Sequence, residues 1–355
     1  MVKKLTIIGV AGGRFCCAGE FFYMLDHTLI TQPVAAESDT LLGTVYQKTL
    51  GHYRVEVAGQ LIDCELSNRL RKILIYPIAD ASSLRPRVVR VDDIRAVDPV
   101  AIGDVVELID AGGGTGLIVG VKERTNALTR LAAGTKPLEQ VIAANVDQIV
   151  AILAAAQPAP KWELLDRYLV AAESCGIPVR ICITKLDLAD RERLEQEIDV
   201  YRRIGYSVLL TSTLTGEGVD RVKAMFSGRM SVLIGKSGVG KTSLLNALEP
   251  GLGLRVNEVS RASSKGKHTT THLEMFPLAI GGSVVDTPGM REFGLWNIGE
   301  RELAEYFPEF RQFAGLCRFG ASCGHNHEPD CAIKTAVEDG QISARRHQSY
   351  LRLKG

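Results

Sequence analysis

The sequence predicts a multidomain protein in which a small all-β domain precedes an α/β domain with a parallel sheet and a short helical module. Three observations predict this order. Short alternating apolar segments separated by glycines fill residues 41–131, as in a small barrel or sandwich. From about residue 146, apolar strand candidates alternate with helical patterns. After residue 299 the strand pattern stops, and three cysteines lie close to a histidine.

Composition limits the class of protein. The chain has 355 residues, 46% of them hydrophobic, which favours two or three domains and excludes wholesale disorder. Its 42 Lys and Arg residues balance 41 Asp and Glu residues. The net charge of +1 therefore gives no broad positive electrostatic field that would attract nucleic acid. No apolar run has the roughly 18–20 residues of a membrane span. The N-terminus shows no apolar segment of secretory length, so we expect a cytoplasmic protein with reduced thiols.

The all-β domain is expected to contain five short strands. They are Leu42–Tyr46, Tyr53–Val57, Gln60–Leu66, Val105–Ile109 and Gly116–Val121. Two basic groups, within 69–72 and 85–95, fit either a solvated surface or a patch that faces RNA. Residues 1–38 are interpreted as an extension or accessory strand.

The α/β domain is expected to alternate strands with helices. The expected strands are Gln148–Leu153, Val179–Thr184, Ser207–Thr211, Ser231–Ile234 and Ser283–Asp286. The expected helices are Trp162–Ser174, Arg191–Ile204, Val219–Phe226 and Lys241–Leu248, and further helices are expected at Glu300–Phe310 and Ile342–Leu353.

A phosphate-binding loop is the strongest motif. Residues 235–242 (GKSGVGKT) fit G-x-x-x-x-G-K-[ST], follow an apolar strand and open a helix, which is the context that the motif requires. The backbone N–H groups of such a loop surround a phosphate. Lys241 is expected to reach the β- and γ-phosphates and to act in catalysis, and Thr242 to ligate Mg²⁺. The other candidate nucleotide-binding residues of this segment are Gly235, Lys236, Ser237, Gly238, Val239, Gly240 and Ser243.

Two later segments are candidates for sensing the γ-phosphate. Asp286 begins the sequence D-T-P-G at the end of a strand, where its carboxylate suits a place beside Mg²⁺ and Gly289 can offer its N–H to the phosphate. Residues 265–272 (KGKHTTTH) lie between the two phosphate motifs. Their threonine hydroxyls can complete the Mg²⁺ coordination, with Thr270 as the first candidate and Thr269 as the second.

A further motif predicts the base. Residues 184–187 (TKLD) follow a strand and resemble the guanine-recognition motif N-K-x-D of GTPases, with Thr184 in place of asparagine. The Asp187 carboxylate can accept hydrogen bonds from the guanine N1–H and amino group, a donor pair that adenine lacks. The Lys185 stem can stack on the base. Ser212, within Thr211–Thr213, marks the supporting loop, where a backbone N–H meets the guanine O6.

The order of these motifs is unusual. In ordinary GTPases the phosphate loop precedes the base motif, whereas here the base motif precedes the phosphate loop. The same sheet can form if only the starting point of the chain has moved. Such a circular permutation places the D-T-P-G segment at the C-terminal end of the GTPase domain, where an attached module could respond to the nucleotide.

The cysteine cluster predicts a metal site. Cys317, Cys323, His325 and Cys331 supply three thiolates and an imidazole, which suits a closed, structural, tetrahedral Zn²⁺ site. His327 is a competing ligand. The segment carries several charged side chains, which argues against the alternative that the cysteines are ordinary core residues.

Together these motifs resemble the family of RsgA, also called YjeQ, the bacterial GTPases of small-ribosomal-subunit biogenesis. Further matches are residues 143–148 (AANVDQ), 165–168 (LDRY) and 325–333 (HNHEPDCAI). The resemblance covers roughly residues 41–353. It implies an OB-fold first domain, GTP hydrolysis stimulated by the small subunit, and action late in the maturation of that subunit.

We expect a division into 1–38 (extension), 39–135 (OB-fold domain that binds RNA), 136–298 (permuted GTPase domain) and 299–355 (zinc module). Three departures stand out. The first 38 residues have no counterpart, the 73–97 stretch is longer than usual, and five residues rather than four separate Cys317 from Cys323. Met290 stands where many GTPases carry a water-orienting Gln, so we expect slow intrinsic turnover with His268 as the candidate that orients water.

The expected cofactors are one structural Zn²⁺ and Mg²⁺ with GTP. The expected partners are the small ribosomal subunit with its rRNA and GTP or GDP, with no membrane, for a protein that is monomeric. Arg345, Arg346 and Arg352 of the zinc module are expected to contact RNA, together with the OB domain. Two alternatives remain: a P-loop small-molecule kinase, or a zinc-bearing RNA-binding module that uses GTP only as a conformational clamp.

Overall fold

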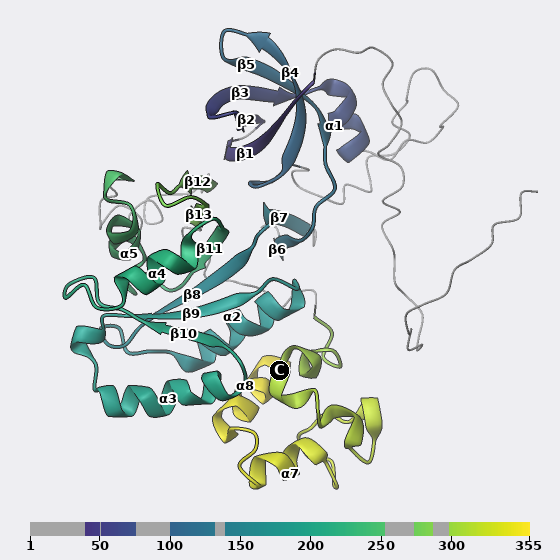
Figure 1. Ribbon diagram of the computed structural model, residues 1–355. Coiled ribbons are helices and arrows are strands. Elements are labelled where there is room, and N and C mark those ends of the chain that lie inside the picture. Colours follow the sequence, from purple (N-terminus) through teal and green to yellow (C-terminus); the bar gives the residue numbers. More distant parts are fainter. Residues whose placement is uncertain (1–39, 50, 76–99, 132–138, 253–272, 287–297) are drawn as a thin grey trace, which may run out of the picture. The chain divides into compact units, whose positions relative to one another are not determined.

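The first described domain is a closed five-stranded barrel. The computed structural model describes residues 40–355 apart from residue 50 and the segments 76–99, 132–138, 253–272 and 287–297. The barrel strands are β1 (Leu41–Thr49), β2 (His52–Val57), β3 (Gln60–Leu66), β4 (Val105–Gly112) and β5 (Thr115–Val121). They run in the order β1-β2-β3-β5-β4, and β4 pairs back to β1, which closes the barrel (Figure 1). The five predicted strands are therefore confirmed, with ends shifted by up to three residues.

Apolar side chains at alternate strand positions fill the interior of the barrel. Val45, Val55, Leu108 and Ile118 are fully buried, because every second side chain of a strand points to the same face. A short helix that the sequence analysis did not predict, α1 (Asn68–Ile75), follows β3 and buries Leu70 against the barrel core.

A hydrogen-bonded junction connects the barrel to the α/β domain. It contains the hairpin β6 (Ala127–Leu131) and β7 (Glu139–Ala144), which was not predicted. Asn145 then takes the left-handed conformation, with a φ of +56°. Its amide donates to the Gly103 carbonyl at 2.9 Å and accepts from the Thr125 N–H at 2.9 Å. The AANVDQ segment thus ties the first domain to the start of the second sheet.

The α/β domain has a six-stranded sheet in the order β10-β9-β8-β11-β13-β12. Its strands are β8 (Gln148–Ala154), β9 (Val179–Thr184), β10 (Ser207–Leu210), β11 (Met230–Ile234), β12 (Leu273–Pro277) and β13 (Ser283–Asp286). All adjacent strands are parallel except β12, an unpredicted strand that runs antiparallel to β13 and also meets β1 over two residue pairs. The predicted parallel sheet is confirmed.

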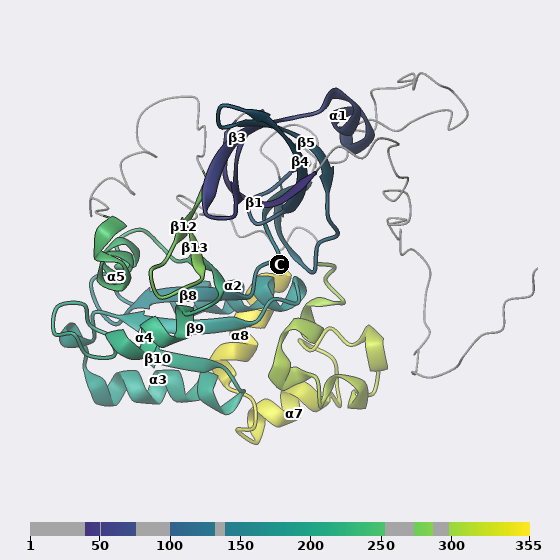
Figure 2. The same ribbon diagram turned by 45° about the horizontal axis from the view of Figure 1, so that its top comes forward.

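Helices cover both faces of this sheet (Figures 1 and 2). They are α2 (Trp162–Ser174), α3 (Arg191–Arg203), α4 (Val219–Phe226) and α5 (Lys241–Leu248), within one residue of their predicted bounds. Leu165 of α2 and Leu194 of α3 belong to one buried cluster, whereas Val222 of α4 and Leu244 of α5 belong to another. The phosphate loop therefore lies between β11 and α5, where Lys236, Ser237 and Gly238 are exposed.

The C-terminal module corrects one prediction. Residues 300–310 do not form an α-helix but two short 3₁₀ turns, Leu303–Tyr306 and Pro308–Phe310. Pro308 explains the break between the two turns, because it has no N–H and disfavours the helical conformation in Phe307. Two helices follow, α7 (Ala332–Glu338) and α8 (Ala344–Lys354), of which the second was predicted. No helix in the described part of the chain has the length and apolarity needed to cross a bilayer.

Candidate nucleotide and metal sites

The phosphate loop has the backbone that its sequence predicts. Gly238 and Gly240 have φ angles of +83° and +95°, which glycine adopts without strain. At Gly235 a Cβ would lie 2.5 Å from the carbonyl oxygen of Ile152, so the loop can pass the neighbouring strand only without a side chain. The Lys241 Nζ donates to the Gly235 carbonyl at 2.6 Å, and it therefore lies across the loop where a phosphate would be held.

The base motif is joined directly to the phosphate loop. The Thr184 hydroxyl is buried and donates to the Val239 carbonyl at 2.5 Å. The Lys185 ammonium donates to the Gly238 carbonyl at 2.8 Å and also to the carbonyl of Gln157. Lys185 itself has a φ of +56°, a left-handed turn at the end of the strand. The structure thus brings the two predicted motifs into one site, although 51 residues separate Thr184 from Gly235.

The candidate base-recognising carboxylate is held by the supporting loop. The Ser212 hydroxyl donates to Asp187 Oδ1 at 2.5 Å and accepts from the N–H groups of Leu214 and Thr215, both at 3.3 Å. The Ser212 N–H is already bonded to the Glu217 carbonyl at 2.9 Å. Ser212 therefore acts through its side chain, and a different N–H of the loop would have to meet a guanine O6.

Several candidates lie outside the described residues. These are His268, Thr269, Thr270, Gly289 and Met290, together with the 1–38 segment and most of 73–97. The backbone of Asp286 ends β13, next to β11 in the sheet, which is the position expected for the residue that begins D-T-P-G.

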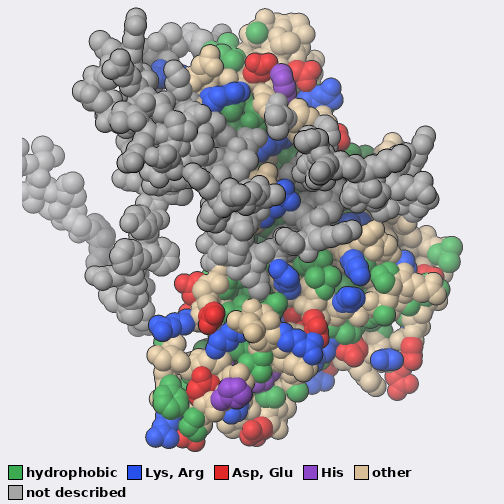
Figure 3. Space-filling view, turned by 180° about the vertical axis from the view of Figure 1, so that it is seen from behind, with side chains coloured by type: hydrophobic (Ala, Val, Ile, Leu, Met, Phe, Trp, Pro, Cys, Tyr) green, Lys and Arg blue, Asp and Glu red, His purple; other side chains and the backbone are tan. Residues whose placement is uncertain are grey.

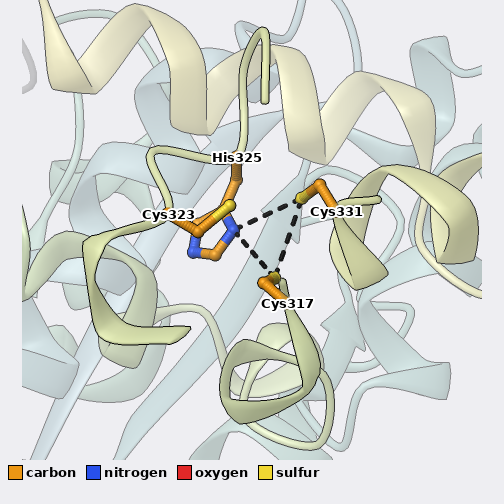
Figure 4. A group of neighbouring side chains, drawn as sticks. All are labelled: Cys317, Cys323, His325 and Cys331. Carbon is orange, nitrogen blue, oxygen red and sulfur yellow. Dashed lines mark hydrogen bonds between the residues drawn. The ribbon is translucent and has the colours of Figure 1, made fainter. Parts of the chain in front are cut away.

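The four predicted metal ligands form one buried cluster (Figure 4). The Cys317 Sγ lies 3.8 Å from the Cys331 Sγ, and each of these sulfurs lies 3.5 Å from the His325 Nδ1. Tetrahedral zinc with bonds of about 2.3 Å to sulfur and about 2.0 Å to nitrogen requires ligand separations of roughly 3.5–3.8 Å. All four ligand atoms, including that of Cys323, lie within 4.8 Å of one another. The donor set and its spacing therefore fit zinc.

Burial shifts the pKa values of His325 and Cys323. It lowers the pKa of His325 and so favours the neutral imidazole that a metal requires. It also raises the pKa of the Cys323 thiol to about 12, so the thiolate would form as the metal binds. His327, the competing ligand, is exposed and does not belong to the cluster.

The last helix holds the loop around His325. The Tyr350 hydroxyl and the Lys354 ammonium donate to the Gly324 carbonyl at 3.2 Å and 3.0 Å. His347 Nε2 lies 2.9 Å from the carbonyl oxygen of His325. Three side chains of α8 therefore fix the backbone that carries the imidazole.

The same helix contacts α2, which corrects the expected role of one of its arginines. Arg346 is fully buried: its Nη1 donates to Asp166 of α2 at 2.8 Å and its Nε to Glu309 at 2.7 Å. Burial opposes the charged form, but these two carboxylates raise the pKa of Arg346. Arg345 is paired with Glu197, and Arg352 with Glu163. Arg346 cannot contact RNA, and the other two also hold the module to α2 and α3.

This buried ion cluster was missed by the sequence analysis. The LDRY segment contained the signal, because an aspartate among the apolar positions of a buried helix face needs a partner. Nothing in the sequence identified that partner, which lies 180 residues later.

Comparison with known proteins agrees with this geometry. The model of the RsgA GTPase family matches residues 121–296. The small ribosomal subunit biogenesis GTPase RsgA of Bacteroides fragilis is 36% identical over 313 residues, which are 87% of this chain and 94% of that protein. The protein of the same name from Yersinia enterocolitica is 44% identical over 245 residues, 67% of this chain and 68% of that protein.

Two solved structures resemble the whole fold. The crystal structure of YjeQ from Thermotoga maritima matches with a TM-score of 0.67 and 31% identity, over 89% of this chain and 97% of that chain. The structure of YloQ, described as a circularly permuted GTPase, matches with a TM-score of 0.66 and 30% identity, over 91% and 96% of the two chains. The predicted permuted architecture is confirmed.

Proposed function

Because this chain belongs to the RsgA GTPase family and is a GTP-hydrolysing enzyme, we propose that it acts in the late maturation of the small ribosomal subunit. Hydrolysis is proposed to be stimulated by that subunit, whose rRNA the barrel and the C-terminal module bind. We propose that the protein acts in the cytoplasm and as a monomer.

One observation carries the nucleotide assignment. Thr184 and Lys185 hydrogen-bond to the Val239 and Gly238 carbonyls, so the base motif and the phosphate loop form one site. Such a site can read the base and the phosphates of one nucleotide. Asp187 would then accept from the guanine edge with its carboxylate fixed by Ser212.

The remaining roles follow from the chemistry of the side chains. Lys241 would leave the loop carbonyls to neutralise the β- and γ-phosphates, and Thr242 would ligate Mg²⁺, which supplies charge stabilisation when bound. Thr270 and Asp286 are proposed to complete the surroundings of that ion, Gly289 to contact the γ-phosphate, and His268 to orient the attacking water. The other loop residues, Gly235, Lys236, Ser237, Gly240 and Ser243, line the phosphates.

The cysteine cluster is proposed to bind one structural zinc ion. Its four buried ligands leave no open coordination position, which is the arrangement of structural rather than catalytic sites. Zinc would stabilise the module whose last helix enters the α/β domain.

The test is nucleotide hydrolysis measured with and without purified small ribosomal subunits. We expect slow turnover of GTP alone, a large increase when subunits are added, and no turnover of ATP under either condition. Preferential ATP use would support a small-molecule kinase instead. Equal binding of subunits in the presence of GDP and of a non-hydrolysable GTP analogue, without stimulated hydrolysis, would support the conformational clamp.

A further inference from the structure

The loop between Cys317 and Cys323, the first two residues of the metal cluster, exposes an aromatic side chain. Among the phenylalanine, tyrosine and tryptophan residues of the described ranges, Phe319 alone is exposed, at 47% of its surface. The Arg318 guanidinium lies over its ring, 5.8 Å from the centroid. Figure 3 shows hydrophobic side chains at the surface of the C-terminal module, at lower left, beside basic side chains.

The backbone on both sides of this ring is fixed. The Gly320 N–H donates to the Cys317 carbonyl at 2.8 Å, and the Ser322 N–H donates to the Phe319 carbonyl at 3.0 Å. The sulfurs of Cys317 and Cys323, which bound the loop, are buried in the metal cluster. The ring is therefore presented on a rigid loop, and little ordering would be required when a ligand binds.

The Arg318 guanidinium beside the ring can exchange its acidic partner for another anion. Arg318 is paired with Asp330 at 3.1 Å, but the two side chains are 64% and 71% exposed. Exposed ion pairs of this kind contribute little stability. The guanidinium can therefore leave the aspartate for a phosphate, which it can bind with two parallel hydrogen bonds.

We propose that Phe319 and Arg318 form a stacking platform for an unpaired base of the small-subunit rRNA. This inference rests on the proposed function. A base has two flat π faces, and aromatic rings and guanidinium planes are the groups on which unpaired bases stack. Phe319 and the exposed Leu316 are a small apolar surface for a protein partner, but the ring is sufficient for one base. In this proposal Phe319 and Arg318 contact the RNA, whereas the buried Arg346 does not.

The test compares three replacements of one ring in the full chain. Purified small subunits are titrated in the presence of a non-hydrolysable GTP analogue, and protein-free small-subunit rRNA is titrated as a second probe. We expect Phe319→Ala and Phe319→Leu to bind both about 10-fold more weakly. Phe319→Trp should bind at least as well as the wild type, since it keeps an aromatic face. Arg318→Ala should reduce both the affinity and its dependence on salt.

Each other outcome has a defined meaning. Unchanged affinity of Phe319→Ala would overturn the platform while the proposed function stands. Weak binding by Phe319→Ala with normal binding by Phe319→Leu would overturn it in favour of an apolar protein contact. If the wild type binds neither probe, the proposed function fails as well. Zinc content and GTP hydrolysis without subunits should be unchanged in all variants, which shows that the module remains folded.

Discussion

At the scale of single residues, Thr184 shows how a departure from a familiar motif keeps its structural role. The sequence resembles N-K-x-D, with threonine at the asparagine position. The hydroxyl donates to the Val239 carbonyl and lies 3.1 Å from the Leu153 carbonyl, so this residue connects the base motif to the phosphate loop. A short β-branched side chain suffices because the loop approaches closely: a Cβ at Gly240 would lie 3.3 Å from the Thr184 Oγ1.

This contact gives the first prediction. Thr184→Val keeps the shape of the side chain but leaves the buried Val239 carbonyl without its donor, a loss of about 1–3 kcal/mol. We expect GDP and GTP to bind about 10-fold more weakly and the protein to unfold at lower urea concentration. Thr184→Ser keeps the hydroxyl and should bind like the wild type. Equal affinities of the valine and serine variants, measured by titration with a fluorescent guanine nucleotide, would contradict this role.

A second prediction concerns the two histidines of the metal loop. His325 belongs to the buried cluster, and His327 is exposed two residues later. We expect His327→Ala to retain one zinc ion per chain and His325→Ala to lose it, with a lower melting temperature, because structural zinc contributes folding energy directly. Elemental analysis and thermal unfolding measure both effects. Loss of zinc from His327→Ala alone would reverse the assignment.

At the scale of elements, the periodic segments could be predicted and the context-dependent ones could not. The barrel strands and the buried β8 and β9 have strong apolar patterns, and the glycines of the phosphate loop have a fixed backbone role. The strand β12 was missed because Met275 is its one buried side chain among residues 274–277, so the segment shows no apolar alternation. The helix expected before the cysteines was wrong because its apolar spacing outweighed the effect of Pro308.

The candidate nucleotide and metal sites were likewise predictable only where their motifs are local in the sequence. Motifs identified Lys241, Asp187 and the four cysteine and histidine residues as candidates, because phosphate loops and metal clusters depend on local spacing. The structure brings the last four together in one cluster. The ion pairs of Arg345 and Arg346 could not be predicted. A basic residue on a helix is expected to be exposed unless an acidic partner on another element is known. Asp166, Glu197 and Glu309 are distant in the sequence.

The helix α8 supplies a third prediction. Arg346→Met removes a buried cation that two carboxylates share, and breaking such a pair costs about 3–5 kcal/mol. Arg352→Met on the same helix removes an exposed pair with Glu163 and should cost less than about 1 kcal/mol. Urea unfolding measures both values. Similar losses for the two variants would contradict a stabilising role of the buried ion cluster between the module and α2.

At the scale of the whole molecule, four hydrophobic clusters correspond to one barrel interior, two faces of one sheet and one C-terminal module. Both apolar and polar side chains connect these clusters. Tyr46 of β1 packs against the sheet cluster, and Val170 of α2 belongs to the cluster of the module. Asn145 makes a polar contact between barrel and sheet, and Arg346 makes one between module and α2. Polar connections of this kind have strict geometric requirements, whereas apolar contacts tolerate sliding. The polar contacts therefore fix the geometry of parts that apolar packing also joins.

The 180 residues between Asp166 and Arg346 have a consequence for biosynthesis. Chains emerge at about 5–20 residues per second, so Asp166 is made roughly 9–36 seconds before the arginine that neutralises it. During that interval α2 can form its helix but cannot bury its acidic face without an uncompensated charge. This contact between distant residues should therefore close late, so that a nascent chain completes its nucleotide domain only after the metal-binding loop has been synthesised.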